Sequence, residues 1–313
     1  MTDTSFIFVA DGPRFEDPAV ILAGSIRVQH GDAAAIHAYC PEEKAQTLSA
    51  FFRAAMAELG VQISPIPAGP SPFAEPYPHG NKILAAAQPR SGARTVFLDT
   101  DTVLLAPLVR KQAQTLVAAV PEGVPTWGRH TGDWAPVYAH FGLPLPDARV
   151  RLCRGRRIEV LPYFNAGFLS FPEHGSHGQR FGKLWLETAA EIDHRLDIPN
   201  KRPWLDQIAL PIAIARSQIG WEAWPEKFNY SLYRRQFPIE ADRALVHYHL
   251  PSLFRADIGC MRAYRSVLRL LPAELARELR QRAPAFEMPG RGRARADFMP
   301  VLDLDAPDQP QPD

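Results

Sequence analysis

The 313-residue sequence has few cysteines, no long hydrophobic run and almost no net charge. Its three cysteines, Cys40, Cys153 and Cys260, are each more than 100 residues from the next, which excludes a zinc site built on closely spaced thiolates. No stretch approaches the roughly 18 consecutive apolar residues that a spanning helix needs. A net charge of +1 provides no overall field to attract nucleic acid, so we expect no nucleic-acid partner.

The amino-terminal residues lack the marks of a secretory signal. The segment MTDTSFIFVA has no basic stretch followed by a long apolar one. An odd and sparse set of thiols suits a reducing compartment. We therefore expect a cytoplasmic protein.

Short hydrophobic strands alternate with helices through much of the chain. The pattern predicts strands at 5–10, 34–40, 61–66, 93–98, 158–163 and 244–250. It predicts helices at 19–28, 41–59, 81–87, 179–196, 205–215 and 264–282, the last interrupted at Pro272. Such alternation is typical of an α/β fold with a mostly parallel sheet and helices on both faces.

Composition changes only towards the carboxyl terminus. We expect one catalytic domain over residues 1–258, two appended helices over 259–283, and a poorly ordered tail rich in Pro, Arg and Asp over 284–313. Residues 121–157 are dense in Pro, Gly and Arg, and their elements are the least defined.

A buried strand ends at two carboxylates, Asp99 and Asp101, separated by Thr100. Residues at i and i+2 can project to one side, and ligands of open α/β sheets bind beyond the carboxyl ends of the strands. Hard carboxylate oxygens suit Mg²⁺ or Mn²⁺ carrying a diphosphate. A metal there would stabilise the charge that develops when a sugar–phosphate bond breaks.

Two other interpretations of this DTDTVL segment remain open. It also fits the first motif of haloacid-dehalogenase-like phosphatases, in which Asp99 would be the nucleophile and Asp101 an acid/base. That motif usually lies on the first strand of its domain, whereas three predicted strands come first here, and Gly132-Asp133 lacks the matching second acid. The plainer interpretation is a solvated turn.

Four segments resemble, in order, the motifs of glycosyltransferase family 8, the group of glycogenin and bacterial galactosyltransferases. The segments are Asp99–Asp101 for DxD, Tyr163–Gly167 for FN[SA]G, Asp206-Gln207 for DQ and Val246–Tyr248 for VHF. The resemblance covers roughly residues 5–255. It implies a GT-A fold, a nucleotide-diphosphate sugar donor that is usually UDP-linked, a glycan or lipid-linked acceptor, and transfer with retention of anomeric configuration.

The resemblance also implies roles for individual residues. Asp99 and Asp101 would hold Mn²⁺ or Mg²⁺ with His247 as third ligand, and Thr100 would lie against the donor. Asn165 and Asp206 would reach the sugar, with Gln207 beside the reacting centre; Lys82 and Asp11 would contact the donor's phosphates, ribose or uracil. The alternatives are a turn residue at Asn165, a helix amino-terminal acid at Asp206, a solvated lysine at Lys82 and a capping role for Asp11.

The late motif departs from the family pattern HFxGxxKPW. Here the chain runs from His247 through His249 to Arg255 without the glycine and the lysine. Arg255 could supply the missing positive charge to the donor phosphates, because a guanidinium binds phosphate in a bidentate fork. We expect His249 to be structural or to face the acceptor. An inactive nucleotide-sugar binder is therefore a third possible function.

The carboxyl-terminal segment 261–295 contains nine arginines and three glutamates. Its leucines recur at helical spacing, at Leu268, Leu271, Leu275 and Leu279. Basic amphipathic helices of this kind can lie on the inner face of an anionic membrane and meet lipid-linked acceptors there. Because Glu274 and Glu278 interrupt the basic face, helices packed on the protein core are the favoured interpretation.

Overall fold

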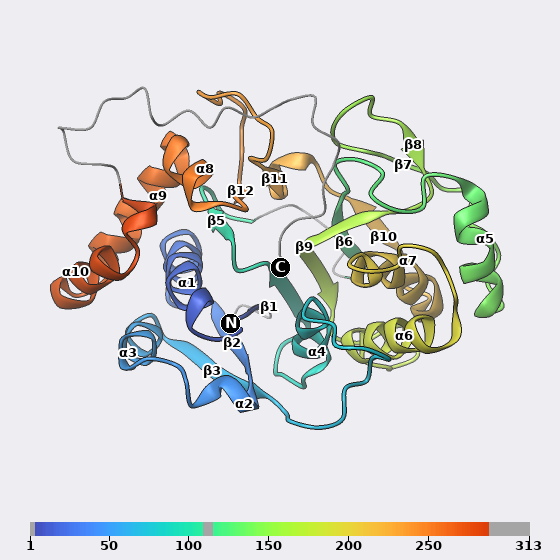
Figure 1. The fold of residues 1–313 in the computed structure, drawn as a ribbon, viewed down its shortest axis with the longest axis horizontal. Helices are drawn as coiled ribbons and strands as arrows, with labels where there is room; N and C mark the ends of the chain where they lie inside the picture. The colour runs from blue at the N-terminus through green and yellow to red at the C-terminus, as the bar shows by residue number, and fades with distance from the viewer. Residues whose placement is uncertain (1–3, 109–114, 288–313) are drawn as a thin grey trace.

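A seven-stranded sheet runs through the centre of the computed structural model, which describes residues 4–108 and 115–287 (Figure 1). Its strand order is β10-β6-β9-β4-β1-β2-β3. The strands are β1 (Thr4–Val9), β2 (Ala35–Pro41), β3 (Val61–Ile66), β4 (Arg94–Leu98), β6 (Val117–Pro121), β9 (Phe164–Pro172) and β10 (Trp221–Ala223). Only β9 runs antiparallel to its neighbours in this sheet. The predicted mostly parallel α/β fold is confirmed.

Helices cover both faces of this sheet. Side chains alternate along each strand, and hydrophobic ones point to both faces, so each face needs a covering layer. In β1, Phe6 and Phe8 belong to one hydrophobic core and Ile7 to the other. The first core packs against α1 (Glu16–His30), α3 (Ala50–Glu58), α9 (Ile258–Leu270) and α10 (Ala273–Arg282). The second packs against α4 (Gly80–Ala87), α5 (Thr131–His140), α6 (Phe181–Arg195) and α7 (Leu205–Ser217).

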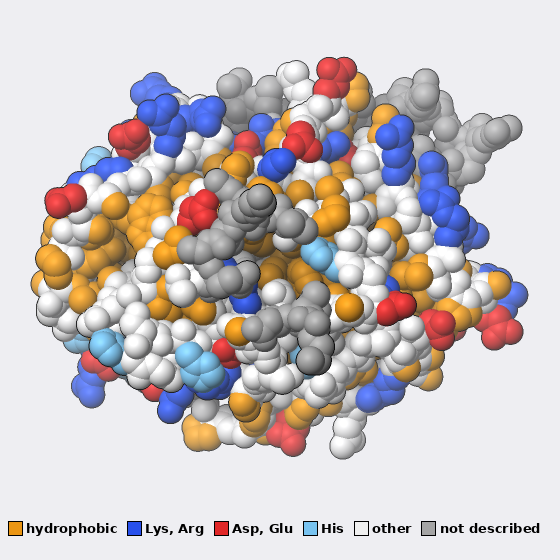
Figure 2. Space-filling model, turned by 180° about the vertical axis from the view of Figure 1, so that it is seen from behind, with side chains coloured by type: hydrophobic (Ala, Val, Ile, Leu, Met, Phe, Trp, Pro, Cys, Tyr) orange, Lys and Arg blue, Asp and Glu red, His pale blue; other side chains and the backbone are white. Residues whose placement is uncertain are grey.

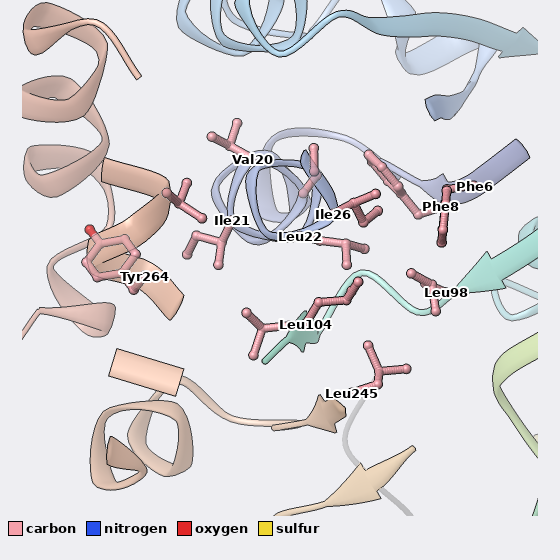
Figure 3. Close-up of a cluster of buried hydrophobic side chains, with 14 of the residues drawn as sticks. Phe6, Phe8, Val20, Ile21, Leu22, Ile26, Leu98, Leu104, Leu245 and Tyr264 are labelled. Carbon is pink, nitrogen blue, oxygen red and sulfur yellow. The ribbon is translucent and has the colours of Figure 1, made fainter. Parts of the chain in front are cut away.

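Helix α1 is buried on nearly all sides, and this explains its continuous apolar run. Figure 3 shows its Val20, Ile21 and Leu22 between Phe8 of β1 and Tyr264 of α9. The carboxyl-terminal helices therefore share a core with the first strand and helix of the chain.

The leucines of the basic carboxyl-terminal helices face this core. Leu268, Leu271 and Leu279 are buried, and Leu275 is partly buried against the same cluster. Arg282 pairs with Glu16 and Asp17 of α1. The favoured interpretation of packed helices is confirmed, because the apolar stripe points inward rather than to a membrane surface. Among the described residues, no helix combines the length and the apolar character that crossing a bilayer requires.

Charge is mixed over the surface. On the face seen in Figure 2, Lys and Arg lie mostly near the margin, with Asp and Glu among them. This distribution agrees with the net charge of +1.

A second sheet of three short strands adjoins the carboxyl end of β4. It consists of β11 (Tyr230–Ser231), β12 (Leu245–His247) and β5 (Thr102–Leu104), in that order. The short helix α8 (Pro251–Ala256) follows β12, and three 3-10 turns lie at Pro13–Phe15, Glu226–Phe228 and Pro284–Phe286. The remainder of the expected tail, residues 288–313, lies outside the described residues.

Several predicted boundaries were wrong. The single helix expected at 41–59 is two helices, α2 (Glu42–Ala45) and α3, because the Ser49 hydroxyl caps α3 by accepting from the Phe52 amide at 3.1 Å. The strand expected at 158–163 is only β8 (Glu159–Val160), paired with β7 (Val150–Arg151) in a separate hairpin-like sheet. Strands β6 and β9 were not predicted at all.

Candidate functional site

The chain reverses after β4 and thereby brings two distant motifs together. The Asp99 amide donates to the Gly167 carbonyl of β9 at 2.9 Å, and the chain then enters β5. Because β5 pairs antiparallel with β12, Thr102 lies opposite His247. The Tyr248 amide donates to the Asp101 carbonyl at 3.1 Å, which closes this ladder. Backbone pairing therefore brings the segments that carry Asp101 and His247 side by side.

Asp101 and His247 form a close pair. The His247 Nε2 atom is 3.1 Å from Asp101 Oδ1, with the imidazole 8% exposed and the carboxylate 35% exposed. Burial raises the pKa of Asp101, but the charge of His247 and the hydrogen bond to it outweigh burial and bring that pKa well below 3.8. Burial lowers the pKa of His247, but the neighbouring Asp101 carboxylate raises it by more. The pKa of His247 therefore lies above 6.5. The carboxylate is ionised and open to an incoming ligand.

His249 joins this pair. Its ring stacks on that of His247 with centroids 3.9 Å apart, and its Nδ1 atom is 3.8 Å from Asp101 Oδ2. Its Nε2 atom is 2.8 Å from the Ser231 hydroxyl oxygen. Burial, and then the neighbouring His247, lower the pKa of His249 to about 3, which keeps this imidazole neutral. One ligand atom from each of Asp101, His247 and His249 lies within 4.8 Å of the other two.

Asp99 forms an ion pair with Lys82. The Lys82 Nζ atom is 3.1 Å from Asp99 Oδ1 and 3.2 Å from Asp206 Oδ2, so one buried ammonium joins two carboxylates. Burial opposes this charge, but the two carboxylates outweigh it and raise the pKa of Lys82 above its usual value. The Tyr77 hydroxyl is also 3.0 Å from Asp206 Oδ1. Three predicted site residues from three different elements are thus in contact.

A third set of contacts connects the amides of the FNAG and DQ motifs. The Asn165 Nδ2 atom donates to Glu122 Oε2 at 2.9 Å, and Asn229 Nδ2 donates to Asn165 Oδ1 at 2.7 Å. Gln207, with its amide nitrogen turned to the surrounding acceptors, donates to the same Glu122 oxygen at 2.9 Å. Burial raises the pKa of Glu122. Glu122 therefore holds both amides in place.

Gly167 allows these sets of residues to approach one another. A Cβ atom there would lie 2.9 Å from the His247 ring and 2.9 Å from Asn165 Oδ1, closer than real Cβ contacts come. The β6–β9 ladder also shifts register between Ala119 and Val120, so β9 bulges beside this glycine. Close packing, rather than a turn, explains the glycine of this motif.

The remaining predicted residues lie around this centre. Thr100 is buried, and its hydroxyl donates to the Val9 carbonyl at 2.5 Å. Asp11, in the loop after β1, forms an ion pair with Lys44 at 2.7 Å. Arg255 is half-buried in α8, which begins two residues after His249.

Sequence reasoning missed Glu122, Asn229 and Tyr77. Glu122 directly follows the apolar run of β6, so the strand-end argument that found Asp99 could have found it too. Asn229 and Tyr77 lie outside any regular strand or helix and left no comparable signal.

Comparisons with known proteins identify the family of the chain and its fold. A family model described as the Rhodobacterales glycosyltransferase domain matches residues 6–218, more than half of the chain. The galactosyltransferase LgtC, solved with donor and acceptor sugar analogues, is similar with a TM-score of 0.54 and 18% identity over 88% of this chain and 99% of that chain. An active-site mutant of LgtC gives a TM-score of 0.53 and 17% identity over 86% and 98% of the two chains. No curated protein matches the sequence.

Proposed function

Because the chain belongs to the Rhodobacterales glycosyltransferase domain family, we propose that it is a metal-dependent enzyme that transfers a sugar from a UDP-linked donor with retention of anomeric configuration. It is a glycosyltransferase with a GT-A fold, and the phosphatase alternative is not favoured. The observation that carries the proposal is the convergence of Asp101 and His247 beyond the carboxyl end of β4. Strand ends of this kind are where α/β proteins bind nucleotides.

The residues present fit a divalent cation. Asp101 offers an ionised oxygen and His247 an imidazole nitrogen, both of which are ligands of Mn²⁺. Asp99 completes the proposed set, since each oxygen that contacts Lys82 keeps a second lone pair. When bound, the cation would offset the negative charge that develops on the departing diphosphate.

The other residues would position the donor around this point. Lys82 stays protonated between Asp99 and Asp206, so it holds Asp206 towards the sugar and adds positive charge near the diphosphate. Glu122 fixes the amide groups of Asn165 and Gln207, which we assign to the sugar and the reacting centre. Thr100, Asp11 and Arg255 remain proposed contacts of the nucleotide and its phosphates.

The proposal is tested by turnover of a panel of nucleotide-sugars. The full chain is incubated with each donor and Mn²⁺, and free nucleotide is measured with and without a chelator. We expect release from at least one UDP-sugar, with a loss of about 100-fold or more on chelation and in Asp101→Asn, because the charge on the leaving group is then no longer offset. Asp147→Asn, in an exposed loop, is the matched control and should keep full activity. Release that ignores both chelator and Asp101→Asn would contradict the proposal.

A further inference from the structure

We propose that His249 is an additional ligand of the metal, so that this chain presents two imidazole nitrogens and prefers Mn²⁺, Co²⁺ or Zn²⁺ to Mg²⁺. The inference rests on the proposed function, because it concerns the same metal site. It goes beyond that function by adding a ligand and by naming the class of metal that the site selects.

The distances fit one shared ion. Two ligand atoms that each lie about 2.2 Å from an ion are about 3.1 Å apart at a right angle and about 3.8 Å apart at 120°. The His247 Nε2 atom is 3.1 Å and the His249 Nδ1 atom is 3.8 Å from oxygens of Asp101. Both imidazoles therefore lie where ligands of an ion on Asp101 belong.

The second ring nitrogen of His249, Nε2, has an oxygen neighbour, as is usual in metal-bound histidines. Ligating imidazoles usually bond their second nitrogen to a neighbouring oxygen, which fixes the ring and leaves the first nitrogen for the metal. Here Ser231 Oγ lies 2.8 Å from His249 Nε2, so Nδ1 is the atom turned towards Asp101. Strand β11 holds Ser231 directly opposite His247 in the ladder.

The backbone at His249 is held in an unusual conformation. Its φ angle is 57°, in the left-handed region that residues other than glycine adopt only in a few per cent of cases, histidine among the more frequent of them. This turn places the His249 ring flat against that of His247, with centroids 3.9 Å apart. A strained residue of this kind persists where the surrounding structure fixes it, as it commonly does at ligand sites.

Two nitrogen donors change which metals bind well. Imidazole binds first-row transition metal ions well, with affinity rising from Mn²⁺, the weakest of them, to Co²⁺ and Zn²⁺. Mg²⁺ prefers oxygen ligands and gives up its water reluctantly. A site of two carboxylates and two imidazoles should therefore discriminate against Mg²⁺ more strongly than a site of two carboxylates and one imidazole.

The test counts nitrogens on bound Mn²⁺. Pulsed electron paramagnetic resonance is recorded on the full chain with Mn²⁺ alone, and affinities for Mn²⁺ and Mg²⁺ are measured by titration. The variants are His249→Gly and His249→Asn, since both residues tolerate the left-handed backbone, and Ser231→Ala. His140→Asn is the matched control. His140 lies on α5, its Nε2 atom is 3.0 Å from Glu191 Oε1, and it does not belong to the candidate metal cluster.

Two coupled imidazole nitrogens are expected in the unchanged protein and one in His249→Gly. The Mn²⁺ affinity should fall at least about tenfold in His249→Gly, and in the same direction in Ser231→Ala, while Mg²⁺ affinity falls less. One nitrogen in the unchanged protein, with the same affinities in His249→Gly, would overturn this inference alone. A lack of Mn²⁺ binding, or a Mn²⁺ affinity that is unchanged in His247→Asn, would overturn the metal dependence of the proposed function together with it.

Discussion

Lys82 is the residue on which the two acidic motifs depend. Replacing it with methionine would leave Asp99 and Asp206 facing each other without the cation between them. Breaking a buried ion pair on one side typically costs about 3 kcal/mol or more. We expect Lys82→Met to lower the free energy of unfolding by that amount, measured by urea denaturation.

Lys44→Met is the control for this change. Lys44 also pairs with an aspartate, Asp11, but its side chain is 43% exposed. An exposed pair contributes less than about 1 kcal/mol, so this variant should stay close to the original stability. Equal losses in the two variants would contradict the role given to Lys82.

Gly167 tests the close approach of the two motifs. A methyl group at this position would push against the His247 ring and Asn165 Oδ1. Overpacking of this kind costs about 1–3 kcal/mol, and here it also displaces a proposed metal ligand. We expect Gly167→Ala to lower both the melting temperature and Mn²⁺ affinity. Gly132→Ala, where an added Cβ meets nothing within 4 Å, should lower neither.

Glu122 should make stability depend on pH. Burial raises its pKa above 4.5, so the folded chain keeps the carboxyl proton after the unfolded chain has lost it. The resulting stability is complete below pH 4.5 and is lost as pH rises through the folded pKa. In Glu122→Gln this fall should be absent when unfolding is measured by urea from pH 4 to 7. Parallel curves for the two proteins would show that burial does not perturb Glu122.

Individual site residues can be predicted from the sequence where they directly follow a recognisable strand. Asp99 and Asp101 follow the best-defined buried strand. In the structure Lys82 contacts both Asp99 and Asp206, and His247 contacts Asp101. Strand periodicity put His249 on the face of His247, but β12 ends at His247 and a left-handed residue turns the second ring onto the first. Such a turn leaves no periodic signal.

At the scale of whole elements, the contact between α1 and α9 shows that the last helices belong to the same core. A Cβ at Gly24 of α1 would lie 2.5 Å from Val267 Cγ1 of α9. We expect Gly24→Ala to destabilise the protein by about 1–3 kcal/mol and Val267→Ala in the same chain to restore part of the loss, since the two positions share one contact. Thermal unfolding of both single variants and the double variant measures this coupling. Strict additivity would contradict the packing.

Elements were predictable where period and boundary signals agree. Strand β3 was predicted at its observed bounds because Gly60 ends the helix before it and an apolar run follows. Strand β9 was missed because its Asn165 and Gly167 are typical of turns, although here they form a bulge inside the sheet. Strand β6 was missed because its run VAAVP is short and borders the segment 121–157, which is dense in proline and glycine.

At the scale of the whole molecule, the sheet order explains how distant motifs meet. The antiparallel strand β9 lies between β4 and β6, so the ends of three strands carry Asp99, Glu122 and Asn165 to one region. The small sheet of β11, β12 and β5 then adds His247 from the far end of the chain. Local periodicity predicts the α/β class, but it does not specify which strands pair across such separations.

Calorimetric titration of the full chain with UDP, with and without Mn²⁺, tests the central claim most directly. If Asp101 and His247 hold a cation against the diphosphate, UDP should bind at least about tenfold more tightly with Mn²⁺, and Asp101→Asn should remove that gain. UDP binding that is equally strong without metal and unchanged in Asp101→Asn would contradict the account.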